Sequence, residues 1–171
     1  MPACRTGRNC GTGGMKQETA ESLRLVALIY GVSAGVNYLW EMGQMPLYAD
    51  MSYRSIRDWA ICFSASLGDG VMTLVIYLLG VAVFKDRLWP RRLRLREAVY
   101  LLLAGAAVSI PVELLSLATG RWRYSPLMPV VPFTGIGFAP LLQMLILPPV
   151  AFRAALCIIP ASGDEKRLPR F

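Results

Sequence analysis

The stretch "SLGDGVMTLVIYLLG", residues 66–80, places one carboxylate between two glycines at the start of an apolar run. On insertion scales an aspartate at the centre of a membrane helix costs about 3 kcal/mol, whereas each Leu, Ile, Val or Phe returns roughly 0.3–0.6 kcal/mol. The surrounding segment, residues 59–84, holds twelve residues of these four types, which together return roughly 4–7 kcal/mol. The segment therefore inserts in spite of Asp69, and it predicts a membrane helix with a carboxyl group in its interior.

The rest of the chain also has the composition of a membrane protein. Of the 171 residues, 55% are hydrophobic and only 17% are charged, and the mean hydropathy is +0.46. Three further segments reach the length of about 20 apolar residues that crossing a bilayer requires, namely residues 23–44, 98–117 and 137–159. We expect an all-α fold, a four-helix transmembrane bundle over residues 23–159. A disordered leader and cytoplasmic lead-in (1–22) would precede the bundle, and a cytoplasmic tail (160–171) would follow it.

The distribution of positive charge predicts the orientation of this bundle. Most of the 18 Lys and Arg residues lie around the start of the first predicted helix, between the second and third, or at the C-terminal end. Cytoplasmic loops carry an excess of Lys and Arg, so we expect these regions, and with them both termini, on the cytoplasmic face of the inner (plasma) membrane. The opposite face receives Arg54, Arg57, Arg121 and Arg123. Because the net charge of +7 is accounted for in this way, we expect no nucleic-acid partner.

The first 14 residues, "MPACRTGRNCGTGG", contain almost no apolar surface to bury. Such a composition is typical of a disordered segment. We expect these residues to be dispensable for membrane insertion. Met15 opens an amphipathic lead-in, and it is an alternative start of translation.

The residue inventory argues against several kinds of site. The chain has no histidine, and its cysteines form no CxxC pair: Cys4, Cys10, Cys62 and Cys157. Zinc and haem sites therefore lack their usual ligands, and Ser–His or Cys–His nucleophiles cannot form. We expect neither a metal nor a cofactor. Any reaction would be metal-independent acid–base chemistry by carboxyl groups.

Polar residues three or four apart form a stripe on the predicted helices, since such residues share a helix face. Together the stripes hold three acids and three amides: Glu41, Asp69, Glu113, Asn37, Gln44 and Gln143. Lipid offers these groups no partners, so the stripes should face each other inside the bundle. At 1.5 Å per residue, all three acids fall in the outer half of the membrane or near its midplane. We expect one polar pocket that opens outward, with Asp69 at its floor.

The segment after the third predicted helix should form the mouth of this pocket. It contains Pro126, Pro129 and Pro132, and this density of proline excludes a regular helix. Arg121 could hold an anionic headgroup there, beside Trp122 and Tyr124. Trp and Tyr also populate the aromatic belts of membrane interfaces, and such a belt is the competing interpretation.

The stretch "VELLSLATGRWRYSPLMPVVP", residues 112–132, is similar to a segment of carotenoid hydratases and small lycopene cyclases, which are polytopic enzymes acting on isoprenoid chains. The similarity rests on an in-membrane glutamate, a Thr-Gly pair, an aromatic-rich turn and two prolines: Glu113, Thr119, Gly120, Tyr124, Pro129 and Pro132. The chain as a whole resembles small bacterial polytopic membrane proteins of unassigned function. The local resemblance implies an isoprenoid substrate.

Two functional hypotheses follow. In the first, the protein binds or processes a lipid or isoprenoid, with Asp69, Glu113 and Glu41 as acid and base, because carboxylic acids in apolar pockets can remain protonated at neutral pH. The residues expected to bind the substrate are Asn37, Gln44, Arg121, Trp122, Tyr124 and Gln143. In the second, the protein is transporter-like or an accessory subunit of a larger membrane complex. The acids then relay protons or serve as interhelical hydrogen bonds, and the partner is a second copy or another membrane protein.

Overall fold

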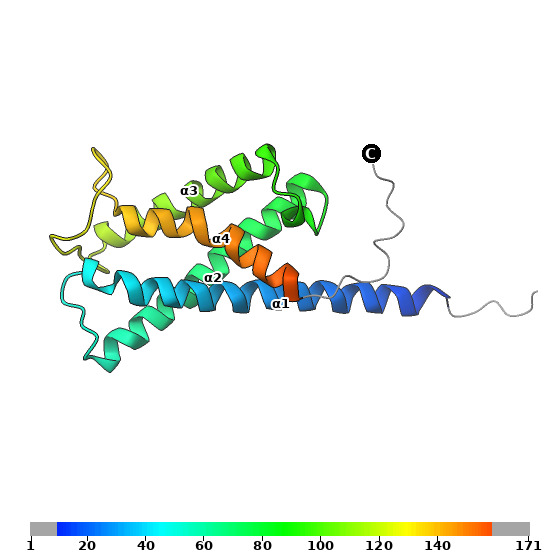
Figure 1. Cartoon of the computed structure of the whole chain (residues 1–171), viewed down its shortest axis with the longest axis horizontal. Helices are drawn as coiled ribbons and strands as arrows, with labels where there is room; N and C mark the ends of the chain where they lie inside the picture. Colours follow the sequence, from blue (N-terminus) through cyan, green and yellow to red (C-terminus); the bar gives the residue numbers. More distant parts are fainter. Residues whose placement is uncertain (1–9, 159–171) are drawn as a thin grey trace, which may run out of the picture.

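The structure, a computed structural model, describes the backbone of residues 10–158 and the side chains of residues 20–158. Four long helices account for most of this part of the chain (Figure 1): α1 (Cys10–Gln44), α2 (Ile56–Phe84), α3 (Leu95–Ala118) and α4 (Phe138–Ile158). Two short 3-10 helices, η1 (Met45–Leu47) and η2 (Trp89–Arg91), lie in the connections, and no strand forms among the described residues. The predicted all-α architecture is confirmed.

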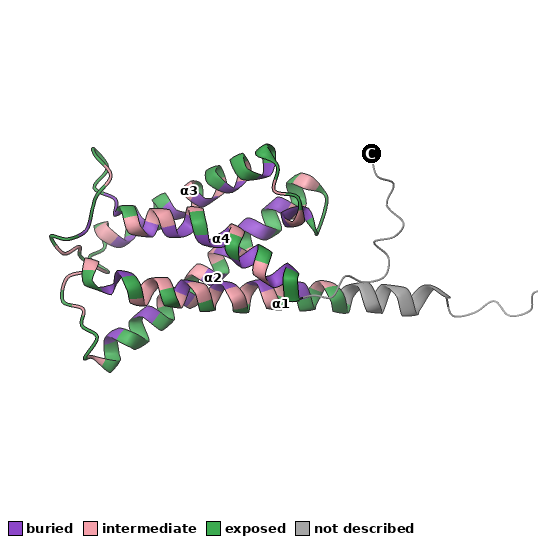
Figure 2. Ribbon diagram, in the orientation of Figure 1, coloured by how far each residue is buried: buried purple, intermediate pink, exposed green. Residues whose placement is uncertain are grey.

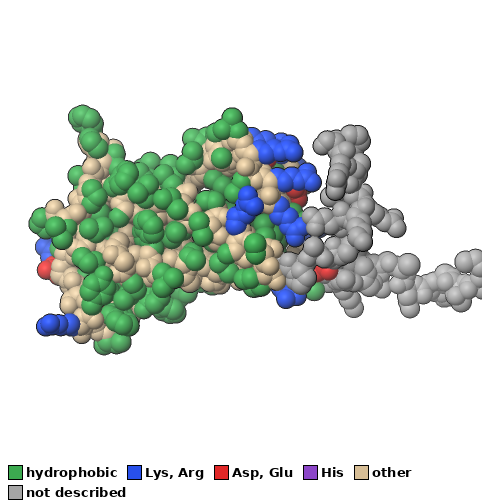
Figure 3. All heavy atoms as spheres, viewed as in Figure 1, with side chains coloured by type: hydrophobic (Ala, Val, Ile, Leu, Met, Phe, Trp, Pro, Cys, Tyr) green, Lys and Arg blue, Asp and Glu red, His purple; other side chains and the backbone are tan. Residues whose placement is uncertain are grey.

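Each of the four helices is long and apolar enough to cross a membrane. Buried residues lie mainly where the helices face each other, and exposed residues lie on the outside (Figure 2). Hydrophobic side chains cover much of the outer surface in the view of Figure 3. A helix surrounded by lipid can expose apolar side chains in this way without cost, because lipid tails are as apolar as leucine. These findings support the prediction of a multi-pass membrane protein.

The helix bounds follow the predicted spans closely, except at the start of the chain. α2, α3 and α4 each agree with the prediction to within one helical turn. α1 begins at Cys10, so residues 10–14 are helical where the sequence predicts a disordered leader. Three of these five residues are glycines, which disfavour a helix, so intrinsic propensity does not account for this extension. The remainder of the predicted leader, residues 1–9, and the predicted tail, residues 160–171, lie outside the described residues.

The bundle has two different ends (Figure 1). We call one the closed end; it holds the α2–α3 connection (residues 85–94) and the C-terminal end of α4. We call the other the loop end; it holds the α1–α2 connection (residues 45–55) and the α3–α4 connection (residues 119–137). Lys and Arg side chains gather at the closed end in Figure 3.

Aromatic packing joins the helices at the closed end. The ring of Trp89 packs against three other rings, with centroid distances of 5.2–5.6 Å, those of Phe84, Tyr100 and Phe152. The Tyr100 hydroxyl also donates a 2.7 Å hydrogen bond to the carbonyl of Ile76. A Cβ atom at Gly80 would lie only 2.5 Å from the Trp89 ring, so glycine is what lets the indole lie against α2. These contacts fix α2 beside α3 at this end.

The two connections pair with each other at the loop end. Tyr48 and Tyr124 form an isolated antiparallel bridge. Next to it the N–H of Ala49 donates a 2.8 Å hydrogen bond to the carbonyl of Arg123. The Arg123 guanidinium also pairs with the carboxylate of Asp50. The α3–α4 connection is therefore held against the start of the α1–α2 connection.

Two glycines set the positions of the α3–α4 connection and of α4: Gly120, just after α3, and Gly105, within α3. Gly120 has a φ of +65°, a left-handed conformation that ends α3 and that glycine adopts without strain. At Gly105, α3 and α4 cross so closely that a Cβ atom would lie 2.5 Å from the carbonyl oxygen of Met144. α4 bends farther along, where Pro148 and Pro149 interrupt its interior (Figure 1). The close crossing holds the first half of α4, and with it Gln143, between the other helices.

Candidate functional site

A cavity of about 720 Å³ lies toward the loop end, and all four helices and both connections line it. Pockets that hold small ligands measure roughly 300–1,000 Å³. Its apolar lining includes Met51, Ile61, Ala65, Met72, Val112 and Met144. The three predicted acids and one predicted amide contribute to its polar lining: Glu41, Asp69, Glu113 and Gln143. The cavity therefore combines apolar walls with carboxyl groups inside a bundle of apolar helices.

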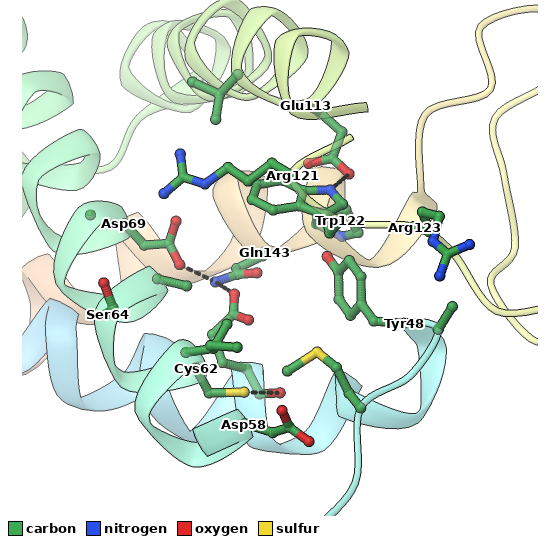
Figure 4. Close-up of a pocket in the computed structure, with 18 of the residues that line it drawn as sticks. Tyr48, Asp58, Cys62, Ser64, Asp69, Glu113, Arg121, Trp122, Arg123 and Gln143 are labelled. Carbon is green, nitrogen blue, oxygen red and sulfur yellow. Dashed lines mark hydrogen bonds between the residues drawn. The ribbon is translucent and has the colours of Figure 1, made fainter. Parts of the chain in front are cut away.

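The Gln143 side chain is the centre of a hydrogen-bond network on one wall of the cavity (Figure 4). Its Nε2 donates to Asn37 Oδ1 at 2.8 Å, to Asp69 Oδ2 at 2.8 Å and to Glu41 Oε1 at 3.1 Å. An amide nitrogen has two hydrogens, so three acceptors compete for two donors. The network is complete only if one hydrogen is shared or one carboxyl carries its own proton.

Residues of α1 that do not line the cavity hold this network in place through further hydrogen bonds. Gln44 Nε2 donates to Glu41 Oε1 at 2.9 Å and to Gln143 Oε1 at 3.1 Å. Asn37 Nδ2 donates to the backbone carbonyl of Ser33 at 2.9 Å and to its hydroxyl at 3.1 Å. The Trp40 indole N–H in turn donates to Gln44 Oε1 at 3.1 Å. Each amide therefore has partners for both its nitrogen and its oxygen, which fixes the orientation of Gln143 toward the acids.

Glu113 belongs to a second cluster, separate from Glu41 and Asp69. It is buried and accepts hydrogen bonds from the Trp122 indole N–H at 3.2 Å and from the Tyr124 hydroxyl. In Figure 4 its carboxyl points toward Trp122 and away from Asp69. The cavity thus presents a pair of carboxyls on one wall and a single carboxyl, held by aromatic donors, on another.

Two tyrosines of the paired connections support this second cluster. The Tyr124 hydroxyl accepts a 2.8 Å hydrogen bond from the N–H of Gly137 while it donates to Glu113. The ring of Tyr48 packs edge-on against Trp122, with centroids 6.2 Å apart. Burial raises the pKa of both tyrosine hydroxyls above their ordinary value. Both therefore remain protonated at neutral pH, and Tyr124 keeps the proton that it donates to Glu113.

Three arginines line the cavity: Arg57, at the start of α2, and Arg121 and Arg123, in the α3–α4 connection. Arg123 is paired with Asp50. Arg121 lies over the ring of Trp122, with its guanidinium carbon 5.6 Å from the centroid, and in Figure 4 its guanidinium extends across the cavity. Among the described residues, neither Arg57 nor Arg121 forms an ion pair with a carboxylate. These two side chains are available to an anionic group.

The structure divides the predicted site residues into two groups. Six of them line the cavity: Glu41, Asp69, Glu113, Arg121, Trp122 and Gln143. The other three, predicted as substrate contacts, lie behind that lining and hold it in place: Asn37, Gln44 and Tyr124. Gly68 faces open space beside Asp69, whereas a Cβ atom at Gly70 would lie 3.1 Å from the Tyr30 ring. Of these two glycines, Gly70 is the one at the close approach to α1.

Several residues of the lining carry no clear signal in the sequence. Tyr48 and Met51 lie in a connection, where helical periodicity gives no direction, and the sequence marks Arg57 only as a topology signal. The one signal that could have identified Arg57 is its spacing of four residues from Ile61, which places both on one face at the start of α2. In the part of the chain that the structure describes, no group of three or more Cys, Asp and Glu residues is placed to hold a metal.

Comparisons with protein-family models, with curated proteins and with solved structures found no match to this chain. The site is therefore characterised by its own geometry. Two carboxyls share one amide, a third carboxyl is held by aromatic donors, and two arginines without carboxylate partners line the same cavity beside its apolar residues.

Proposed function

We propose that the protein binds a lipid or isoprenoid in this cavity and carries out acid–base chemistry on it. One observation carries the proposal: a single amide nitrogen, that of Gln143, contacts the carboxyls of both Glu41 and Asp69 on the wall of a cavity that also has apolar walls. Ionisable residues inside a membrane protein are costly and usually functional. Structural hydrogen bonding alone needs no cavity beside them.

The donor count supports a proton held by the carboxyl pair. Gln143 Nε2 faces three acceptors with two hydrogens, so the network gains a donor when either Glu41 or Asp69 is protonated. The protonated carboxyl is then a general acid, and the ionised one can accept a proton. Such groups contribute roughly 10²–10⁴-fold to a rate. Glu113, which accepts hydrogen bonds from Trp122 and Tyr124, is the candidate base on the other wall.

The local resemblance supports an isoprenoid as the ligand. The stretch that resembles carotenoid hydratases and lycopene cyclases includes Glu113 and Tyr124, which are hydrogen-bonded to each other. An isoprenoid chain has no polar group to anchor along its length, and it matches the apolar lining of the cavity. Arg121 and Trp122 would contact the end of the ligand nearest the loop end.

The second candidate is a transporter-like protein or an accessory subunit of a larger complex. The hydrogen bonds from Asn37 to Ser33, and from Gln44 and Gln143 to their partners, favour a structural role for part of the network. In this view the acids relay protons or only join helices. A ligand that remains bound through purification distinguishes the two candidates, because a purely structural network needs none.

Filling the cavity tests the proposal. Gly68 lines the cavity, and a Cβ atom there would have no neighbour within 4 Å, so Gly68→Phe is expected to reduce the lipid that co-purifies in mild detergent several-fold. Gly35→Phe is the matched control, because Gly35 is also a helix-interior glycine with open space around it but lies outside the cavity lining. Mass spectrometry of extracted lipid measures both. Equal lipid content in the two variants would contradict the proposal.

The same experiment extends to the chemistry through Asp69→Asn. An amide of the same shape can still take part in the network, so the gel-filtration profile should not change. Conversion of the ligand is expected to fall by roughly 10²–10⁴-fold, as for loss of a general acid. Lipid extracts of cells producing either form measure the substrate that accumulates. Normal conversion by Asp69→Asn would remove Asp69 from the acid–base role.

The charge distribution predicts the orientation of the site. With the closed end and both termini in the cytoplasm, the loop end and the cavity mouth lie on the outer face of the inner membrane. Alkaline phosphatase fused after Gly135, in the α3–α4 connection, should be active, and the same enzyme fused after Arg170 should be inactive. The opposite pattern of activities would reverse the orientation.

A further inference from the structure

The cavity has one weakly joined side, between α2 and α3. The described contacts between these two helices are concentrated at the closed end: the hydrogen bond from Tyr100 to Ile76, the Phe84–Tyr100 ring contact and the Arg96 guanidinium over Phe84. Figure 1 shows α2 and α3 diverging from there toward the loop end. No described hydrogen bond or ring contact joins them along the diverging part.

The cavity extends into this gap. Its lining takes Ile61 and Met72 from α2, and Ser109 and Val112 from α3. Ile61 is 45% exposed and Val112 is 36% exposed, so neither side chain is covered by the opposite helix across the gap. Both helices are long and apolar enough to cross a membrane. The surface between them would then face lipid chains, and the gap connects the cavity to the hydrocarbon of the bilayer.

The two arginines without carboxylate partners lie one on each side of this gap, at the loop end. Arg57 is in the first turn of α2, and Arg121 follows α3 directly after Gly120. The nearby carboxylates are already engaged: Asp50 pairs with Arg123, and Asp58 accepts a 3.0 Å hydrogen bond from the N–H of Ser52. Arginine binds phosphate through paired hydrogen bonds of fixed geometry. The end of the gap is therefore complementary to a phosphate-type anion.

We infer that the ligand is an anionic amphiphile, in which a phosphate-type headgroup binds Arg57 and Arg121 and an apolar chain enters from the bilayer between α2 and α3. This inference rests on the proposed function, and it adds the chemical class of the ligand and its route. The headgroup remains at the level of the helix ends, and the chain passes Ile61 and Val112 toward the carboxyl pair. The arrangement matches a membrane lipid, with charge at the interface and chain in the apolar interior.

Binding to the purified protein in detergent tests the headgroup. The probe is a fluorescent single-chain lipid phosphate monoester, and the comparison ligand is the alcohol of the same chain. The wild-type protein should bind the phosphate about tenfold or more tightly than the alcohol, and Arg57→Gln and Arg121→Gln should each weaken only the phosphate, by about tenfold. Equal affinity for both probes, or no effect of either substitution, would overturn the headgroup assignment.

Inorganic phosphate and the Gly68→Phe variant separate the remaining explanations. Inorganic phosphate alone should not displace the probe at millimolar concentration, and displacement would identify a free phosphate as the ligand and overturn the lipid assignment. Gly68→Phe should weaken both the phosphate and the alcohol. If Gly68→Phe weakens both probes while the arginine variants change neither, the cavity binds a lipid but not through an anionic headgroup. If neither probe binds the wild-type protein, the proposed function itself is wrong.

A pair of α3 variants tests the route. Val112→Trp places a large side chain at the edge of the gap, and it should slow transfer of the probe from vesicles to the protein several-fold. Leu103→Trp is the control, because Leu103 is 67% exposed on the same helix and does not line the cavity. Equal transfer rates in the two variants would exclude the opening between α2 and α3.

Discussion

Replacing Gln143 by leucine is expected to destabilise the protein by about 2–5 kcal/mol. The substitution removes the donor that contacts Asn37, Glu41 and Asp69 and the acceptor that Gln44 uses. Interhelical hydrogen bonds in membrane proteins average about 0.6 kcal/mol and reach about 1.7 kcal/mol each. Acceptors left without partners add to this loss. Unfolding in mixed detergent micelles with increasing dodecyl sulfate, followed by circular dichroism, measures the difference from the wild type.

Met144→Leu is the matched control for this prediction. Met144 is the next residue on α4, is equally buried and lines the same cavity, but its side chain takes no part in the network. A swap of similar volume usually changes stability by less than about 1.5 kcal/mol. If Gln143→Leu proved as stable as Met144→Leu, the hydrogen bonds seen around Gln143 would contribute nothing to the bundle.

The helices could be predicted because each depends on a long local pattern. The apolar run around Asp69 is long enough to offset one carboxyl, and insertion depends on that sum rather than on tertiary contacts. The apolar segment predicts that α2 starts at residue 59, three residues later than its observed start at Ile56. The reason is that the start is set by the N-cap residue Ser55, which a hydropathy pattern does not detect. Ser55 accepts a hydrogen bond from the N–H of Asp58 and so includes Ile56 and Arg57 in the helix.

The candidate site could be predicted only where helical spacing determines direction. Glu41 and Asp69 lie on polar stripes that must face inward, and Gln143 is the polar residue that α4 offers them. The distance between Glu113 and this pair depends instead on Trp122 and Tyr124. Their directions follow from the path of the connection after Gly120, and no periodic pattern in the sequence encodes that path.

Helical spacing also does not distinguish the residues that line the cavity from those that support the lining from behind. Asn37 and Gln44 share a helix face with Glu41, so the sequence groups all three as contacts of one pocket. In the structure Asn37 is fully buried and Gln44 is 4% exposed. Both amides are covered by Gln143, to which they are hydrogen-bonded, and of the three residues Glu41 alone lines the cavity. The acid network that lines the cavity is therefore held in place by two amides, Asn37 and Gln44, that do not line it.

The second large effect is expected from Gly105→Val. A Cβ atom at Gly105 would lie 2.5 Å from the backbone carbonyl oxygen of Met144, and 3.2 Å from the side chain of Leu145. A backbone atom cannot rotate away, so α3 and α4 must separate. Overpacking of this kind costs about 1–3 kcal/mol, and the β-branched valine belongs in the upper part of that range. Gly31→Val is the control, because a Cβ atom there has nothing within 4 Å.

Separation of α3 from α4 should also disturb the acid network, since Met144 directly follows Gln143. A shift of α4 moves the Gln143 amide relative to Asn37 and Asp69, which lie on other helices and stay in place. The two substitutions should therefore be non-additive: Gln143→Leu is expected to cost less in a Gly105→Val background than in the wild type. Coupled neighbours typically differ from additivity by about 0.5–3 kcal/mol. Unfolding of the two single variants and the double variant measures the coupling, and strict additivity would mean that the close crossing at Gly105 does not position the site.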